Sequence, residues 1–150
     1  MFDLSFLPLS DRVELPAYGT DESAGLDVRA FLPETGPLIL DPGDSYTMPL
    51  GFATAFPPGF GILLIPRSGL GSKLLELRNT VGLIDSDYRD QWIIKLRHKG
   101  EPGVDLAIFI SHGDRIAQAV PVVVPRAVLR VVSALPESSR SGGFGSTGER

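Results

Sequence analysis

The sequence predicts an all-β protein with a single domain, at most one short helix, and strands arranged as a sandwich or a jelly-roll-like barrel. Its length of 150 residues is that of one domain. The chain contains 17 glycines and 13 prolines, which promote turns and interrupt helices. Between them lie about ten short apolar runs of strand length, a pattern typical of sandwiches and barrels.

The predicted strands follow one another along most of the chain, and most of them end near a glycine or a proline. Phe2, Leu4 and Phe6 alternate with polar residues, which indicates a strand with one buried face. Pro121 has no N–H group and therefore predicts a break or a free edge in the longest run. The runs after the first cover residues 26–31, 45–48, 52–56, 60–65, 81–84, 92–96, 106–110, 115–124 and 128–132.

One segment has the spacing of a helix. Leu70, Leu74 and Leu77 recur at helical intervals, which predicts a short helix within residues 68–78. Two glycines at the start of this segment disfavour a long helix. We therefore expect one short helix in a molecule made mainly of strands.

The C-terminal segment differs from the rest of the chain. Pro136 is followed by ESSRSGGFGSTGER, which has one large apolar residue, Phe144. Such a sequence buries too little apolar surface to form a core of its own. We therefore predict a β domain over residues 1–135 and a flexible C-terminal arm over residues 136–150.

Composition argues against several classes of function. A formal net charge of −4 argues against binding duplex nucleic acid, which requires a basic surface. Without cysteine there is no disulfide framework and no thiolate site, and His98 and His112 are too isolated to predict a metal centre. No apolar run approaches the roughly 20 residues of a membrane span, and the first residues do not resemble a signal peptide. We predict a cytoplasmic protein that binds neither membranes nor duplex nucleic acid.

Five stretches combine glycine, which lets backbone approach a ligand, with charged or hydroxyl side chains. They are distributed over most of the chain and therefore depend on the fold to bring them together. In order they are SAGLDVRA (residues 23–30), PRSGLG (66–71), NTVGLIDSDY (79–88), GDRIAQ (113–118) and RSGGFGSTG (140–148).

PRSGLG places Arg67 and Ser68 where an apolar strand gives way to a turn or to the start of a helix. Exposed amides at such a place suit a phosphate, and the guanidinium and hydroxyl groups add donors. The alternative is an ordinary turn with a surface arginine.

In NTVGLIDSDY, the apolar run carries Asp85 out of a strand into a polar turn, with Asp87 close behind. A carboxylate within hydrogen-bond reach of water can act as a general base, which typically contributes a factor of about 10² to 10⁴ in rate. The alternative is an aspartate-rich turn that closes a hairpin, with Tyr88 packed beside it.

Asp27 and Gln118 are polar residues within predicted strands. Asp27 lies between Leu26 and Val28, so alternation places it on the opposite face, where a carboxylate can hold Mg²⁺ through water. The alternative is a solvent-facing strand residue. Gln118 would be a buried amide in need of partners, and the alternative is a satisfied core or interface amide.

The glycine-rich tail carries an aromatic ring and phosphate-binding groups. An arm that orders on a ligand would stack Phe144 on a base and bind phosphate through Arg140, Ser146 and Thr147. The alternative is a disordered terminus.

Together and in order, the five stretches resemble the five motifs of the trimeric dUTPase family over most of the chain. The resemblance implies a jelly-roll-like (β-clip) subunit and a homotrimer whose active sites are shared between neighbouring subunits. It implies that the C-terminal arm closes over a site. It also implies the reaction, which is Mg²⁺-dependent hydrolysis of dUTP to dUMP and pyrophosphate by attack of water on the α-phosphorus.

The resemblance assigns roles on the phosphate side. Asp27 would contact the waters bound to Mg²⁺. The phosphates would be bound by Arg67, Ser68 and Gly69, and Gln118 would lie near the α-phosphate.

It also assigns roles around the base and in the arm. Asn79 would contact uracil, Tyr88 would pack against the deoxyribose and exclude a 2′-hydroxyl, and Asp85 would activate the water. In the arm, Phe144 would cover the uracil ring, Arg140 would hold the γ-phosphate, and Ser146 and Thr147 would add phosphate contacts.

Two other functions stay open at this point: a dCTP deaminase-like enzyme that releases ammonia from dCTP, and a non-catalytic trimer that senses nucleotides for regulation. Asp85 and Tyr88 favour the dUTPase. The chain departs from the family at Asp90, where glycine is common, and in the spacing between Arg140 and Phe144, which is one residue shorter than usual.

Overall fold

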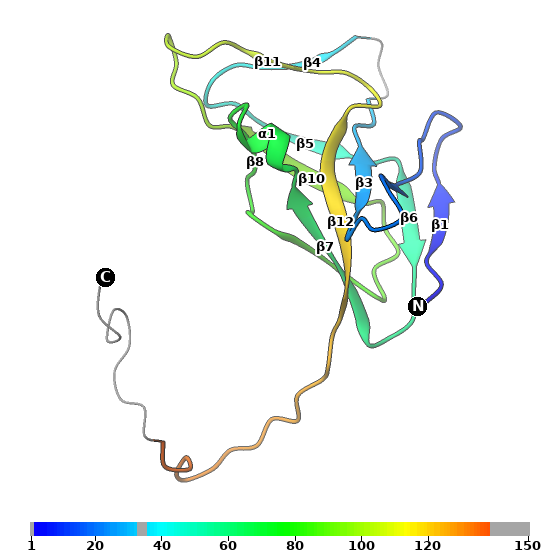
Figure 1. Cartoon of the computed structure of the whole chain (residues 1–150), viewed down its shortest axis with the longest axis vertical. Coiled ribbons are helices and arrows are strands. Elements are labelled where there is room, and N and C mark those ends of the chain that lie inside the picture. The colour runs from blue at the N-terminus through cyan, green and yellow to red at the C-terminus, as the bar shows by residue number, and fades with distance from the viewer. Residues whose placement is uncertain (1, 33–35, 139–150) are drawn as a thin grey trace.

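The computed structural model describes residues 2–32 and 36–138. Short strands make up almost all of its regular structure, which confirms the prediction of an all-β fold with one short helix (Figure 1). The elements are β1 Ser5–Pro8, β2 Ala17–Tyr18, β3 Leu26–Arg29, β4 Leu38–Leu40, β5 Ser45–Pro49, β6 Phe52–Ala55, β7 Phe60–Pro66, α1 Ser68–Gly71, β8 Leu75–Leu77, β9 Gly82–Asp85, β10 Ile93–His98, β11 Ile108–Ile110 and β12 Arg115–Val123.

The strands form antiparallel sheets, of which the largest has the order β2-β3-β12-β7-β9. A three-stranded sheet has the order β5-β10-β8, and two-stranded sheets pair β1 with β6 and β11 with β4. In the largest sheet β12, the last strand among the described residues, lies between β3 and β7. The motifs at residues 23–30, 66–71 and 113–118 therefore meet on or beside neighbouring strands.

The core lies between the five-stranded sheet and the three-stranded sheet. Val28 and Ile62 come from the first sheet and Met48 from the second, and all three are fully buried. Trp92 is also fully buried, and its indole N–H donates to Thr54 Oγ1 at 3.0 Å. This hydrogen bond satisfies a donor that would otherwise be costly to bury.

Most predicted strands are confirmed, with ends that differ by one or two residues, except that the first begins at Ser5 and not at Phe2. Three observed strands, β2, β4 and β8, were not predicted as strands. Strands β2 and β4 span two and three residues and are too short to show a period, and β8 lies within the predicted helix. At Pro121 one edge of strand β12 is free, as the missing N–H group predicted. Strand β12 pairs with β3 as far as Ala119, whereas its pairing with β7 continues to Val123.

The helix is shorter than predicted. It ends at Gly71, and Leu74 has a φ of 61°, a left-handed conformation in which a helix cannot continue. Residues Leu75 and Leu77 then form β8, which pairs with β10, and both side chains are buried. The spacing of Leu70, Leu74 and Leu77 was therefore not that of a helical face, because Leu74 lies in a turn and Leu77 is a buried position of β8.

The predicted strand over residues 128–132 is absent from the described structure, where this segment has no regular structure. After β12 the chain leaves the body and runs away from it (Figure 1). Leu129 is 93% exposed, and Val128 and Val131 are also exposed. A strand requires a partner strand, and this segment finds none among residues 2–32 and 36–138 of its own chain.

No helix in the described part of the chain has the length and apolar character that crossing a membrane requires.

Candidate active site

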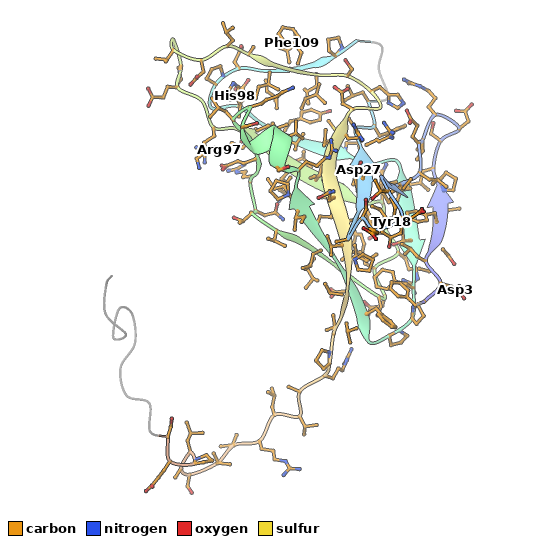
Figure 2. All side chains as sticks on the ribbon, viewed as in Figure 1. Asp3, Tyr18, Asp27, Arg97, His98 and Phe109 are labelled. Atoms are coloured by element: carbon orange, nitrogen blue, oxygen red, sulfur yellow. The ribbon has the colours of Figure 1, made fainter. Side chains whose placement is uncertain are left out.

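Asp27, which lies on β3, is the centre of a cluster of charged side chains. Its Oδ1 atom lies 3.0 Å from Nε of Arg67, and its Oδ2 atom lies 3.3 Å from a terminal guanidinium nitrogen of Arg115. Asp27 is only 8% exposed, and Figure 2 shows it on β3 in the body of the molecule. The alternative of a solvent-facing strand residue is therefore wrong. A carboxylate is costly to bury unless cations or hydrogen-bond donors accompany it, and Asp27 has two arginines beside it.

One oxygen of this carboxylate retains an unused acceptor. The Oδ1 atom is buried and has no hydrogen bond, although Nε of Arg67 lies within ion-pair distance. Arg67 therefore supplies charge to Oδ1, but its N–H is not aligned with this oxygen. Buried polar atoms are almost always hydrogen-bonded, so Oδ1 is a natural acceptor for an ordered or metal-bound water.

Gln118 and Arg67 are placed beside Asp27 by strand pairing. Gln118 lies opposite Asp27 on β3 and opposite Ile65 on β7, and Arg67 follows the end of β7. A cavity of about 410 Å³ adjoins this cluster. Its lining includes Arg67, Gly69, Lys73, Asp114 and Arg115.

Two glycines on this side of the site, Gly25 and Gly69, differ in whether packing requires a glycine there. A Cβ on Gly25 would lie 2.9 Å from Cγ2 of Val120 and 3.2 Å from the carbonyl oxygen of Ala119, so close packing of β12 requires a glycine there. A Cβ on Gly69 would meet no heavy atom within 4 Å. The packing of this chain does not require Gly69, which leaves ligand approach as a reason for it. Ser68, the first residue of α1, is exposed beside it.

Residues 79–82 form a tight turn into β9. The N–H of Val81 donates to the carbonyl of Asn79 at 2.6 Å, and the Asn79 amide donates to the Val81 carbonyl at 3.4 Å. Thr80 has a φ of 63°, a strained conformation for a β-branched residue. Strain of this kind occurs at functional sites more often than elsewhere.

Asp85 ends β9 with an exposed side chain, and Tyr88 is held beside it. The Tyr88 N–H donates to the Asp85 carbonyl at 3.1 Å, and its hydroxyl donates to the Gln91 carbonyl at 3.1 Å. A cavity of about 240 Å³ is lined by Asn79, Gly82, Asp85 and Tyr88, among others. The turn after Tyr88 does not require glycine, because Asp90 does not have a positive φ.

The two groups of predicted site residues are far apart within one chain. Asp85 lies opposite Gly61 on β7, and Gln118 lies opposite Ile65 on the other side of β7. Four residues along a strand correspond to about 13 Å and two strand spacings to about 10 Å, so the two backbones are roughly 16 Å apart. The chain brings together Asp27, Arg67 and Gln118 in one cluster, and Asn79, Asp85 and Tyr88 in another.

Four predicted residues, Arg140, Phe144, Ser146 and Thr147, lie outside the described residues. Within the described part of the chain, no three side chains of histidine, cysteine, aspartate or glutamate converge to hold a metal ion.

Comparison with known proteins shows the family to which the chain belongs. A family model for dUTPase matches residues 11–148. The chain belongs to the dUTPase family. The deoxyuridine 5′-triphosphate nucleotidohydrolase of Hahella chejuensis is 46% identical over 145 residues, which are 95% of this chain and 91% of the relative. The relative from Ralstonia nicotianae is 44% identical over 149 residues, 97% of each chain.

Solved dUTPase structures share the fold. A mutant dUTPase of Staphylococcus bacteriophage 80alpha, solved with dUpNHpp, superposes with a TM-score of 0.84 at 25% identity and covers 97% of this chain and 98% of its own. The jelly-roll-like fold predicted from the sequence is therefore confirmed.

Sequence reasoning missed Arg115, although it lies in the GDRIAQ motif. No local pattern in the sequence indicates that Asp27 is buried or that a second arginine lies beside it. The sequence does not reveal the register shift in β12 between Arg115 and Ala117 that determines where the Arg115 side chain points.

Proposed function

We propose that this dUTPase-family chain hydrolyses dUTP to dUMP and pyrophosphate, with Asp85 as the general base that activates water for attack on the α-phosphorus. Asp85 has the required properties. Its carboxylate is exposed at the end of β9, borders the cavity beside Asn79 and Tyr88, and is free of the ion pairs found among the described residues. A carboxylate without a cation partner has both oxygens available to accept a hydrogen bond from water.

The turn at residues 79–82 and Tyr88 would bind the nucleoside. The Asn79 amide and the backbone of a strained turn offer hydrogen-bond groups to the edge of uracil, in a cavity of about 240 Å³. A turn that closely follows this edge leaves no room for a 5-methyl group, which would reject thymine. Tyr88, fixed by its hydroxyl bond to Gln91, would present its ring to the deoxyribose and exclude a 2′-hydroxyl.

The Asp27 cluster would bind the triphosphate. Arg67 supplies a guanidinium, Ser68 and Gly69 supply hydroxyl and amide donors, and Gln118 would contact the α-phosphate. The buried Oδ1 atom of Asp27 fits Mg²⁺ bound through water, because it needs a donor and a metal-bound water is one. When bound, Mg²⁺ would neutralise charge on the phosphates.

The distance between the clusters carries the proposal that the active site is shared in a homotrimer. Asp85 and Gln118 both have roles at the same α-phosphate, yet their backbones are roughly 16 Å apart in one chain. Residues that act on one phosphate must come within about 3 Å of it or of its attacking water. Asp85 of one subunit would therefore complete the phosphate cluster of another.

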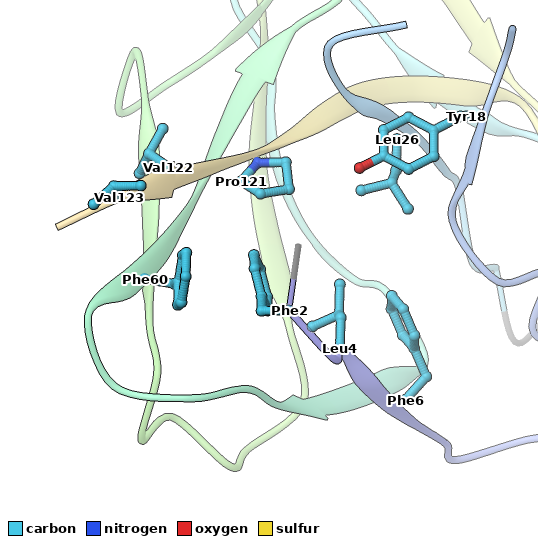
Figure 3. Close-up of a pocket in the computed structure, with 9 residues that line it drawn as sticks. All are labelled: Phe2, Leu4, Phe6, Tyr18, Leu26, Phe60, Pro121, Val122 and Val123. Atoms are coloured by element: carbon cyan, nitrogen blue, oxygen red, sulfur yellow. The ribbon is translucent and has the colours of Figure 1, made fainter. Parts of the chain in front are cut away.

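Exposed apolar surface supports assembly. An apolar pocket has a volume of about 640 Å³. Figure 3 shows the residues that line it, which are Phe2, Leu4, Phe6, Tyr18, Leu26, Phe60, Pro121, Val122 and Val123. The chain after β12 carries exposed Val128, Leu129 and Val131 away from the body. Exposed apolar side chains that lie together can form contacts between subunits.

The C-terminal arm would complete the site by covering the uracil with Phe144 and by binding phosphate through Arg140, Ser146 and Thr147. Closure of an arm excludes water other than the nucleophile. These roles, the domain boundary at residue 136 and the cytoplasmic location stay predictions.

A pyrophosphate-release assay with Mg²⁺ across dUTP, dTTP, dCTP and UTP tests the proposal. We expect dUTP to be cleaved with a kcat/KM at least about 100-fold above that of the other three, because each of them lacks a hydrogen-bond match or adds a clashing group. Equal cleavage of all four would contradict the assigned base and sugar contacts. Release of ammonia from dCTP would instead favour the deaminase alternative.

A further inference from the structure

We propose that Arg115 is a positioning residue, which fixes the Asp27 carboxylate and thereby keeps Arg67 available to the metal-bound triphosphate. This inference rests on the proposed function of the Asp27 cluster. Arg115 has no role in the proposed function so far, although it follows Asp114 in the GDRIAQ motif and lines the same cavity as Arg67 and Gly69.

The contacts divide the two oxygens of Asp27 between two arginines. Arg115 donates to Oδ2 at 3.3 Å, and Arg67 lies 3.0 Å from Oδ1 without an aligned hydrogen bond. An unrestrained arginine and carboxylate prefer to form two parallel hydrogen bonds. Because Arg115 occupies Oδ2, Arg67 is prevented from making that paired contact. Oδ1 is left for water, and the other donors of Arg67 are left for a ligand.

A β-bulge directs Arg115 toward Asp27. Ala117 lies opposite Val28 and Arg115 lies opposite Arg29, so two steps along β12 match one step along β3. By regular alternation Arg115 would share the face of Ala117, which is fully buried in the core. The extra residue moves Arg115 onto the face of Asp27, as bulges commonly do near active sites.

The neighbouring arginine on the same face has other partners. Arg29 pairs with Glu14 at 3.1 Å and donates to the carbonyl of Gly113 at 2.8 Å. Asp114, the acid next to Arg115 in sequence, accepts the N–H of Ser111 at 2.7 Å. Arg29 and Asp114 therefore both have partners other than Asp27, and Arg115 is the second cation beside Asp27. Arg29 serves as a matched control.

Titration with dUpNHpp, a non-hydrolysable analogue, tests this role without relying on turnover. We expect Arg115→Gln to weaken binding of the analogue about tenfold with Mg²⁺ present, because one charge-assisted hydrogen bond that orders the cluster is lost. The kcat at saturating dUTP should change by less than about threefold, since Asp85 is untouched. Arg115→Lys should bind with intermediate affinity, because it retains charge but not the planar fork. Arg29→Gln should bind within about twofold of the unaltered chain.

A double substitution separates positioning from general loss of charge. If Arg115 acts through Asp27, then Arg115→Gln should cause no further loss of affinity in a chain that already carries Asp27→Asn. An additive loss of about tenfold in the double variant would contradict the proposal, because Arg115 would then contact the phosphates directly.

The outcomes distinguish this inference from the proposed function. An unaltered chain that neither hydrolyses dUTP nor binds the analogue would contradict the proposed function. An active chain in which Arg115→Gln binds as well as the unaltered chain, or in which Arg29→Gln loses as much, would overturn the role of Arg115. If Arg115→Gln fails to fold, binding of the analogue to Arg115→Lys tests the proposal instead. Unaltered affinity in that variant would contradict the proposal.

Discussion

Arg67 lies beyond the end of β7, yet its Nε atom lies 3.0 Å from Oδ1 of Asp27 on β3, two strands away in the same sheet. The strand between them is β12, where Gln118 lies opposite Asp27. Three motifs that are far apart in the sequence therefore meet at one place on one sheet. The placement of β12 between β3 and β7 creates this half of the site.

Asp85 provides the most direct test of the catalytic assignment. We expect Asp85→Asn to lower kcat by about 100-fold or more, because an amide cannot accept the proton of the attacking water. Binding of dUpNHpp should change by less than about threefold, since the side chain is nearly the same size. Steady-state kinetics together with calorimetric titration measure both quantities, and undiminished turnover would remove Asp85 from its role.

Tyr88 allows sugar selection to be separated from the hydroxyl bond that holds the ring. We expect Tyr88→Ala to raise the kcat/KM for UTP relative to dUTP by about tenfold, because the ring no longer blocks the 2′-hydroxyl. Tyr88→Phe, which keeps the ring and loses only the bond to Gln91, should preserve the preference within about threefold. An unchanged preference in Tyr88→Ala would show that another group reads the sugar.

Substitution of Gly25 tests why the motif at residues 23–30 contains a glycine. Its added Cβ would lie 2.9 Å from Val120 Cγ2 and 3.2 Å from the Ala119 carbonyl. We expect Gly25→Ala to lower the free energy of unfolding by about 1–3 kcal/mol through overpacking between β3 and β12. Gly71→Ala is the control, because its Cβ would meet nothing within 4 Å. Thermal denaturation of both variants measures the difference, and equal stabilities would refute the packing explanation.

Two truncations distinguish assembly from closure of the arm. A chain that ends at Leu135 lacks the arm, and we expect it to remain trimeric with kcat/KM lowered by about 100-fold, because bulk water is no longer excluded. A chain that ends at Val124 also loses the exposed Val128 and Leu129, and we expect it to be monomeric. Sedimentation velocity and dUTP hydrolysis report the two properties. A trimeric chain ending at Val124 would contradict the proposed interface.

The fold class and most site residues were predictable, because they depend on patterns within short stretches of the sequence. Glycine and proline punctuation with short apolar runs predicted an all-β fold, and the motif order predicted the residues of both clusters. The spacing of Leu70, Leu74 and Leu77 wrongly predicted a longer helix, because Leu74 has a left-handed conformation and Leu77 is a buried position of a short strand. Short runs do not distinguish the two periods.

Other features depend on contacts that no local pattern encodes. The burial of Asp27 follows from two arginines that approach from β7 and β12, and alternation alone placed it in solvent or beside a ligand. The role of Arg115 follows from a bulge in β12. The apolar run at residues 128–132 has strand character, but its partner is not found in the described part of its own chain. Pairing of this kind is decided by tertiary and quaternary contacts.

Mixed trimers of two inactive chains test the sharing of the active site most directly. Asp85→Asn lacks the proposed base, and Arg67→Gln lacks a phosphate ligand from the other cluster. Equal amounts of the two variants are unfolded in urea and refolded together, and each is also refolded alone as a control. If Asp85 of one subunit acts beside Arg67 of another, random mixing should restore about a quarter of the unaltered activity. Mixed trimers as inactive as the separate variants would contradict the account.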